Sequence, residues 1–327
     1  MGRCFDRSRC SVRPDSAVST GLPPDVEGTV VTVGTFDGVH LGHAAVLDEI
    51  GERARRRGLH SVLVTFDRHP LTVVRPGLAP ALLTTPDEKK EILAQRGPDY
   101  VAFLPFTRRL SRLSPEAFVR RILVDRFRVR ELVIGYDHGF GRSRSGDIGL
   151  LSRLGRELDF EVDVVNAVEA EGRPVSSTAI RDLVGEGKVD AASRMLGRPY
   201  SFRGPGIHGL GRGHDLGFPT ANIPAPAGNK LLPCQGIYAV RASLRTEIRD
   251  GLLHLGPRPT FAGSPPSIEL YILDFDRLIY GETVRVEFLK RLRDVRPFDS
   301  AEALIEQMRL DERSARDWFE SHRTPAD

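Results

Sequence analysis

With 327 residues, 40% of them hydrophobic and 28% charged, the chain is long enough for two globular domains with separate cores. It has no apolar run of about eighteen residues and no apolar segment within residues 1–25, so we expect neither a membrane span nor a secretory signal. A formal net charge of +3 and only three cysteines exclude an overtly basic nucleic-acid binder and a disulfide framework. A reducing cytoplasm fits this cysteine content best. We expect no nucleic-acid or membrane partner and infer no obligate protein partner.

The first half of the chain alternates predicted strands and helices. Residues 1–26 mix Arg, Ser, Pro and Asp without periodicity, and we interpret them as a disordered tail. Short apolar runs then predict strands at 30–33, 61–66, 100–104, 131–135 and 160–165. Helical spacing and caps predict helices over 41–54 and 86–95, from 115 and from about 147. This alternation is typical of an α/β, Rossmann-like domain with a parallel sheet covered on both faces, which we place at 27–198.

The second half of the chain has a different pattern. Gly-rich and Pro-rich stretches separate short alternating runs at 236–244, 251–255, 268–275 and 283–289. These runs predict an antiparallel sheet or small β-barrel, followed by helices over 300–309 and 312–321. We place the domain boundary between Leu196 and Ser201, which makes 199–327 the second domain.

Four arginines lie near the end of the first predicted helix: Arg53, Arg55, Arg56 and Arg57. Positive charge at a helix C-terminus complements the helix dipole. We therefore interpret this cluster as a solvated helix face and not as a ligand site.

The turn between the first strand and the first helix carries the strongest functional pattern. It reads Gly-Thr-Phe-Asp-Gly-Val-His-Leu-Gly-His over residues 34–43. Its glycines allow close approach of a ligand to the backbone, and a helix N-terminus favours phosphate. His40 and His43 are three residues apart, so both project from one side of the first turn. There they can donate hydrogen bonds to triphosphate oxygens as charge develops at the α-phosphorus.

This string resembles the FMN adenylyltransferase module of bacterial bifunctional FAD synthetases, within the nucleotidyltransferase superfamily. The segment Ser-Ser-Thr-Ala-Ile-Arg at 176–181 is similar to a second motif of that module. Hydroxyls ahead of a helix can cap it and hold a phosphate, and an arginine adds a planar cationic fork. The resemblance implies that His40 and His43 are catalytic. It also implies a nucleotide-binding set: Gly34, Phe36, Asp37, Gly42, Ser177, Thr178 and Arg181.

Two further loops resemble the family's flavin-binding segments less closely. Thr-Phe-Asp-Arg-His-Pro at 65–70 has Arg68 where the family has proline, and Gly-Tyr-Asp-His-Gly-Phe-Gly at 135–141 has His138 where the family has phenylalanine. The resemblance implies that Phe66, Asp137 and Phe140 contact the flavin.

A second site is indicated near the start of the second domain. The chain has no P-loop motif, so a kinase activity needs another phosphate cradle. The Gly-rich segment 211–222 ends in Thr220 and Asn222, whose side chains face the same way if the segment is extended. Hydroxyl and amide oxygens suit Mg²⁺, which also keeps waters and substrate phosphates. From composition alone, an ordinary Gly/Pro loop is an equal alternative.

The string Gly-Phe-Pro-Thr-Ala-Asn at 217–222 resembles the riboflavin kinase module, and segments of the remaining domain follow in the family's order. The resemblance implies that Gly213, Thr220 and Asn222 bind nucleotide and that Thr220 and Asn222 hold Mg²⁺. It implies that Glu269 is catalytic and accepts the proton of the ribityl 5′-hydroxyl. By strand alternation alone, Glu269 would be a solvent-facing residue.

We therefore expect ATP-dependent phosphorylation of riboflavin to FMN, followed by adenylyl transfer to FMN giving FAD and pyrophosphate. ATP is the co-substrate of both steps and Mg²⁺ the cofactor. The chain departs from the family pattern at several positions: Arg68, His138, Gly139, Leu210, His214 and His254. Two alternatives follow. One is a divergent paralogue that keeps a single activity or uses a flavin analogue, and the other is a non-catalytic flavin-binding protein.

Overall fold

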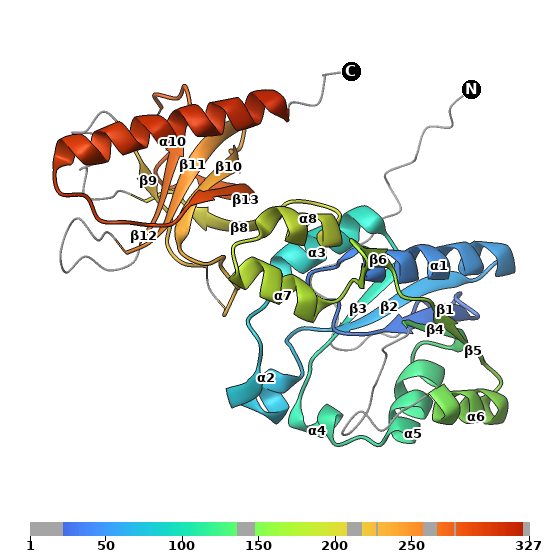
Figure 1. Ribbon diagram of the computed structural model, residues 1–327. Coiled ribbons are helices and arrows are strands. Elements are labelled where there is room, and N and C mark those ends of the chain that lie inside the picture. The colour runs from blue at the N-terminus through green and yellow to red at the C-terminus, as the bar shows by residue number, and fades with distance from the viewer. Residues whose placement is uncertain are drawn as a thin grey trace, which may run out of the picture. The chain divides into compact units, whose positions relative to one another are not determined.

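The computed structural model describes residues 22–135, 148–207, 218–226, 228–257, 267–277 and 279–322. Contacts divide the chain into two compact units, Met1–Ser177 and Thr178–Asp327 (Figure 1). Most of the tail predicted at 1–26 lies outside the described residues. The helices α7 (Ser177–Gly185) and α8 (Val189–Leu196) precede the expected boundary at 198, and that boundary stays a prediction.

A five-stranded parallel sheet forms the centre of the first unit, in the order β3-β2-β1-β4-β5. The strands are β1 (Thr29–Val33), β2 (His60–Phe66), β3 (Tyr100–Leu104), β4 (Val129–Gly135) and β5 (Glu161–Val165). All pairings are parallel, and the strand order switches sides between β1 and β4. In open α/β sheets, ligands bind outside the carboxyl ends of strands at such a point. The predicted Rossmann-like sheet is confirmed.

Helices cover both faces of this sheet, as its strand sequences require (Figure 1). Side chains of successive strand residues point to opposite faces, so Val30 packs with α1 (Leu41–Arg57) and α3 (Pro86–Arg96). Its neighbour Val31 packs with α5 (Pro115–Phe118), its π-helical continuation Val119–Val124, and α6 (Ile148–Leu158). The strands are therefore apolar on both sides.

Several short elements of the first unit have no counterpart among the predicted ones. They are α2 (Leu71–Val74), a 3₁₀ turn (Pro76–Leu78), α4 (Arg108–Ser111) and the hairpin of β6 (Glu169–Ala170) with β7 (Arg173–Pro174). Each is too short to carry a helical or alternating pattern of apolar residues.

The interpretation of the arginine cluster as a solvated face is wrong for Arg53. Its guanidinium pairs with Glu49 at 2.6 Å, with Glu131 and with Asp163. Glu131 is only 2% exposed, and Arg57 also reaches it at 3.3 Å. Because Glu131 and Asp163 belong to β4 and β5, Arg53 fastens α1 to two strands of the sheet.

The second unit is a six-stranded antiparallel sheet in the order β8-β13-β10-β11-β12-β9. The strands are β8 (Tyr200–Pro205), β9 (Ala221–Asn222), β10 (Gly236–Ser243), β11 (Ile248–Gly256), β12 (Ser267–Ile272) and β13 (Thr283–Arg293). Its two edges meet just beyond β8, where the N–H of Ile207 donates to the carbonyl of Asn222 at 2.8 Å and the reverse bond is 3.2 Å. This bridge closes the sheet, as the predicted barrel requires.

One helix, α10 (Ala301–Ser321), follows the barrel where we predicted two. Asp311 lies at the predicted break but is 6% exposed and accepts hydrogen bonds from Arg293 of β13 at 2.8 and 2.6 Å. Ala315 and Phe319 pack the helix onto the sheet. Asp311, which lies between the two predicted helices, thus anchors one continuous helix to the barrel. Within the described ranges, no helix combines the length and the apolar character needed to cross a membrane.

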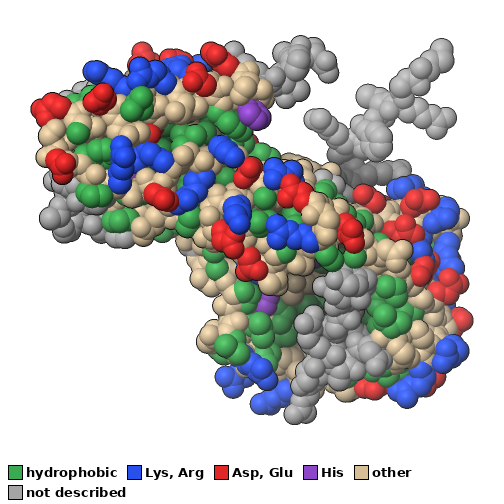
Figure 2. Space-filling model, viewed as in Figure 1, with side chains coloured by type: hydrophobic (Ala, Val, Ile, Leu, Met, Phe, Trp, Pro, Cys, Tyr) green, Lys and Arg blue, Asp and Glu red, His purple; other side chains and the backbone are tan. Residues whose placement is uncertain are grey.

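Charged side chains of both signs are interspersed on the visible face of each unit (Figure 2). The described residues on this face therefore form no extended basic surface of the kind that binds a nucleic-acid backbone. The expectation of no nucleic-acid partner stays a prediction.

Candidate active sites

The turn after β1 has an unusual backbone that is fixed by buried side chains. Phe36, Gly38 and Val39 adopt positive φ angles of 49°, 81° and 40°. For a β-branched residue such as Val39 this region is rare, and such strain costs about 1–3 kcal/mol per residue. Phe36 is 3% and Val39 1% exposed, both packed in the core beneath α1. Their burial offsets the strain and holds the turn in one conformation.

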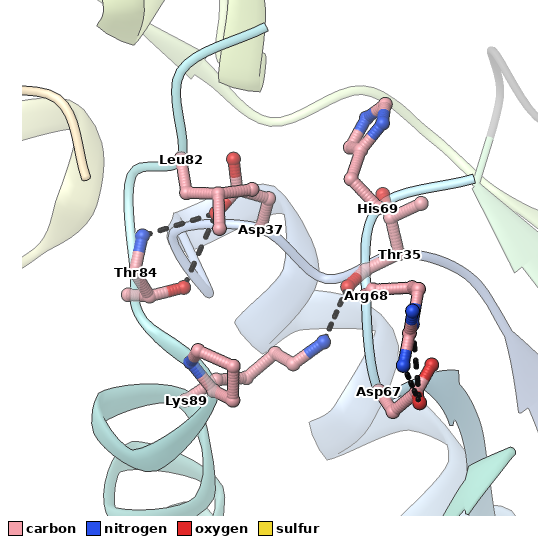
Figure 3. A pocket seen from close by; sticks show the side chains of 9 residues that line it. Thr35, Asp37, Asp67, Arg68, His69, Leu82, Thr84 and Lys89 are labelled. Atoms are coloured by element: carbon pink, nitrogen blue, oxygen red, sulfur yellow. Dashed lines mark hydrogen bonds and ion pairs between the residues drawn. The ribbon is translucent and has the colours of Figure 1, made fainter. Parts of the chain in front are cut away.

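Asp37 ties this turn to the segment that precedes α3. Its carboxylate accepts hydrogen bonds from the backbone N–H groups of Leu83 and Thr84, each at 3.0 Å, and from the Thr84 hydroxyl at 3.2 Å (Figure 3). The same hydroxyl accepts from the N–H of Gly38 at 3.1 Å. These contacts give Asp37 a bracing role; its predicted contact with nucleotide stays a prediction.

The structure brings the two predicted histidines together in a stack. His40 is the N-cap of α1, and its Nδ1 accepts from the N–H of His43 at 3.3 Å. Their ring centroids are 3.7 Å apart, and His43 also stacks on Phe36 at 4.4 Å. Because Nδ1 of His40 is an acceptor, the neutral ring carries its proton on Nε2.

Two of the predicted glycines leave room for this stack. A Cβ atom at Gly42 would lie 3.3 Å from Cε1 and Nδ1 of His40, and one at Gly34 would lie 3.0 Å from the Phe36 ring. Both distances are tighter than ordinary van der Waals contacts. The absence of side chains at these two positions therefore allows the rings to pack against the turn.

The predicted Ser-Ser-Thr motif contacts the turn through its second serine. The Ser177 hydroxyl, at the start of α7, donates to the backbone carbonyl of Asp37 at 2.9 Å. Thr178 is exposed and Arg181 half-buried on the same helix. Ser177 thus joins two motifs that are far apart in the sequence.

The predicted flavin residues are described only in part. Asp137 and Phe140 fall in 136–147, outside the described residues. Phe66 is 9% exposed and packs edge-on against Phe106, with centroids 5.0 Å apart. Arg68, which replaces the family's proline, is exposed and lies 3.4 Å from Asp67.

Sequence reasoning missed Lys89, which lines a pocket beside the turn (Figure 3). The pocket is bounded by Thr35, Asp37, Asp67, Arg68, His69, Leu82, Thr84, Pro86 and Lys89. Lys89 is 8% exposed, and this burial lowers its pKa to about 8, against the opposing effect of Asp37 and Asp67. The one signal in the sequence is its place four residues before the apolar Leu93, which puts both on one side of α3.

In the second unit, three polar residues form a row across neighbouring strands. Glu269 of β12 is paired with His254 of β11 on one side and with Asn222 of β9 on the other. Directly paired residues project from the same face of a sheet. The Ser267 hydroxyl donates to Oε1 of Glu269 at 2.7 Å, and Nδ1 of His254 lies 3.9 Å from the same oxygen.

Glu269 is less exposed than strand alternation alone suggests. It alternates with the buried Ile268 and Leu270, yet its own side chain is only 18% exposed. The side chain is thus half-buried on the face opposite to Ile268 and Leu270. Tyr271, two residues on, packs edge-on against Phe218 at 5.4 Å, which anchors the segment leading to Asn222.

The residues predicted to hold Mg²⁺ have the appropriate chemistry. Thr220 is half-buried immediately before β9, and Asn222 faces the Glu269 side of the sheet. Hydroxyl and amide oxygens fit a hard cation that takes its other ligands from phosphates and water. In the described ranges, no cluster of three or more His, Cys, Asp or Glu side chains could hold a metal ion. Gly213 lies in 208–217, outside the described residues.

Two family models together span most of the chain. The FAD synthetase model matches residues 22–179, which contain the turn with the stacked histidines. The riboflavin kinase model matches residues 196–319, which contain the row around Glu269.

Comparison with a solved structure agrees with the fold. A protein of Streptococcus pneumoniae described as a macrolide-efflux protein superposes with a TM-score of 0.80 at 31% identity, covering 91% of this chain and 96% of that one. Its description differs from the enzyme names of both family models, so only the shared fold is taken from it.

Curated relatives are similar over nearly the whole chain. The Escherichia coli K12 protein is 36% identical over 294 residues, covering 90% of this chain and 93% of the relative. The Listeria monocytogenes protein is 38% identical over 292 residues, covering 89% and 92%, and the Bacillus subtilis protein is 32% identical over 301, covering 90% and 94%. All three are described as bifunctional riboflavin kinase/FMN adenylyltransferases, and this chain belongs to that family.

Proposed function

We propose that the second unit phosphorylates riboflavin with ATP and that the first unit transfers the adenylyl group of a second ATP to FMN. The observation that carries this proposal is the separate placement of two sets of reactive residues. The stacked His40 and His43 lie in the first unit, and Glu269 lies beside Asn222 in the second.

In the kinase reaction, Glu269 accepts the proton of the ribityl 5′-hydroxyl as that oxygen attacks the γ-phosphorus of ATP. The new O–P bond gives FMN, and the broken P–O bond releases ADP. Support comes from the Ser267 hydroxyl, which fixes one carboxylate oxygen at 2.7 Å and so orients the other. A positioned carboxylate of this kind acts as base or orienter in phosphoryl transfer.

Thr220 and Asn222 would hold Mg²⁺ together with the nucleotide phosphates. The bound ion would neutralise part of the phosphate charge. Asn222 is paired with Glu269, so the nucleotide would be held next to the proton acceptor.

In the adenylyl transfer, a phosphate oxygen of FMN attacks the α-phosphorus of ATP, and pyrophosphate leaves. His40 and His43 donate hydrogen bonds to the phosphate oxygens as their charge grows. The N-terminus of α1 adds free N–H groups and a positive dipole end at the same place. Ser177 completes the nucleotide contacts of the first unit, while Phe66, Asp137 and Phe140 contact the flavin. The nucleotide contacts of Thr178 and Arg181 stay predictions.

Both reactive sets are complete in this chain, which favours the bifunctional enzyme over a paralogue with one activity or a flavin-binding protein without turnover. Riboflavin, FMN and ATP are then its substrates. The cytoplasmic location and the lack of an obligate protein partner stay predictions.

Product chromatography tests this proposal directly. Purified protein with riboflavin, ATP and MgCl₂ should form FMN and then FAD, and with FMN in place of riboflavin it should form FAD and pyrophosphate. EDTA should stop both reactions. Binding of riboflavin and FMN without any product would instead favour the flavin-binding alternative. FMN without FAD in both assays would favour the single-activity paralogue.

A further inference from the structure

Lys89 makes an unusual set of contacts for a buried lysine. It lies in the first half of α3, and its side chain extends to the carboxyl ends of β1 and β2 (Figure 3). Its Nζ donates to the backbone carbonyls of Thr35 at 3.1 Å and Phe66 at 2.8 Å, and to the hydroxyl of Thr65 at 3.4 Å. All three donors of the ammonium therefore have neutral oxygen acceptors.

The acidic side chains near Lys89 are engaged by other groups. The carboxylate of Asp37 accepts from Leu83 and Thr84, and that of Asp67 accepts from the N–H of Phe106 at 2.9 Å and pairs with Arg68. Both act on Lys89 only at longer range.

The other groups around the ammonium add no negative charge. His69 and Arg68 line the same pocket from the loop after β2, and the His69 ring points away from Lys89 (Figure 3). The Phe103 ring of β3 lies 5.6 Å from Nζ. Within the described ranges, no carboxylate pairs directly with Lys89. Its buried ammonium is therefore held only by the neutral oxygens of Thr35, Thr65 and Phe66. Such burial is costly and is found mainly where the charge has a use.

We propose that Lys89 is a positioning residue of the adenylyl-transfer site, an inference that rests on the function proposed above. By holding the carbonyl of Thr35, the ammonium fixes the turn in which Phe36 has its positive φ of 49°. The Phe36 ring supports His43, and His43 supports His40. The same ammonium adds a buried positive charge at the strand ends where ATP phosphates would bind.

Loss of the proton from Lys89 should weaken this arrangement. A charged donor makes hydrogen bonds roughly twice as strong as a neutral one, and the positive charge disappears entirely. Because burial lowers the pKa of Lys89 to about 8, this loss falls in an accessible range. Adenylyl transfer should therefore decline above about pH 8, while riboflavin phosphorylation in the other unit should not share that decline.

The experiment uses the full chain and measures both half-reactions from about pH 6.5 to 9.5. For wild type, kcat/KM of FAD formation should fall about tenfold per pH unit above pH 8, as expected when one protonated group is required. Lys89→Gln should be about 10- to 100-fold slower at pH 7 and show no such decline. Lys89→Arg, which stays charged at every pH tested, should recover part of the rate and also lack the decline.

Two controls accompany these variants. Lys90→Gln removes the neighbouring exposed lysine, which pairs with Asp87 at 3.2 Å, and should behave as wild type. Riboflavin phosphorylation by each variant reports on folding of the second unit, and thermal unfolding reports on the first. If Lys89→Gln fails to fold, the pH profiles of FAD formation by wild type and by Lys89→Arg still test the role of Lys89.

Three results would overturn the proposal: a flat wild-type profile for FAD formation, a Lys89→Gln rate within about twofold of wild type at pH 7, or an unchanged alkaline decline in Lys89→Arg. These outcomes are separable from failure of the proposed function. In that case wild type would form no FAD at any pH.

Discussion

Burial of Lys89 makes the stability of the first unit depend on pH. Loss of its proton should stabilise the folded first unit, although it should slow adenylyl transfer. Its pKa is about 8 in the folded protein and 10.5 as the reference for an exposed lysine. Between these values the unfolded chain binds more protons than the folded one, so the free energy of unfolding rises with pH. Across the whole window the gain is on the order of 3 kcal/mol.

Urea unfolding of wild type and Lys89→Met checks this prediction. Lys89→Met has no proton to lose, so the difference in unfolding free energy should shift in favour of wild type as pH rises from about 7.5 to 9.5. Adenylyl transfer by wild type should decline over the same range. A constant difference between the two proteins would show that Lys89 titrates normally.

At the level of single residues, the sequence predicts side chains that belong to contiguous motifs and misses those defined by distant partners. His40 and His43 are three residues apart in one contiguous motif, and the N-cap hydrogen bond from the N–H of His43 to Nδ1 of His40 places them on one side of the turn. Lys89 and Lys90 are adjacent residues of the same type, and neither belongs to a motif. In the folded protein, Lys89 contacts the carboxyl ends of β1 and β2, whereas Lys90 remains at the surface.

Among the elements, α10 depends most clearly on one ion pair. Asp311 receives both arms of the Arg293 guanidinium, and their side chains are 8% and 20% exposed. Removing the carboxylate leaves a largely buried cation without its partner, which costs about 3 kcal/mol. We therefore expect Asp311→Ala to destabilise the second unit by that amount.

The fluorescence of Trp318 measures this effect specifically, because it is the one tryptophan of the chain and it packs with the core beneath α10. Urea unfolding followed at this residue should show a lower midpoint for Asp311→Ala. Asp317→Ala, on the exposed face of the same helix, is the matched control and should leave the midpoint unchanged. Equal midpoints for all three proteins would show that the ion pair does not hold the helix.

Elements with long apolar patterns could be predicted, and those stabilised by distant contacts could not. The five strands of the first unit follow from runs of apolar residues, because a sheet covered on both faces requires them. The break predicted within 300–321 is wrong, since one helix spans this range. The burial of Asp311 depends on its ion pair with Arg293 of β13, which is distant in the sequence and cannot be predicted from local spacing. The strained turn at Phe36 and Val39 likewise depends on a core that local propensity does not reveal.

The whole molecule carries its two reactive sets on different units, and this makes complementation between inactive variants a direct test. Glu269→Gln should lose about 10²- to 10⁴-fold in riboflavin phosphorylation and still convert supplied FMN to FAD. The double variant His40→Ala, His43→Ala should form FMN from riboflavin and stop there. Each protein alone should then make little or no FAD from riboflavin and ATP.

Mixing the two variants should restore FAD formation from riboflavin, because FMN released by one protein can bind the intact adenylyl-transfer site of the other. The restored rate should depend on the concentration of free FMN, so it should show a lag that added FMN abolishes. Chromatography of the mixture over time measures both. If the mixture accumulates FMN without FAD while Glu269→Gln still uses supplied FMN, the released FMN has not reached a usable concentration. If Glu269→Gln also fails with supplied FMN, the carboxylate is needed by both reactions, and the assignment of one reaction to each unit is wrong.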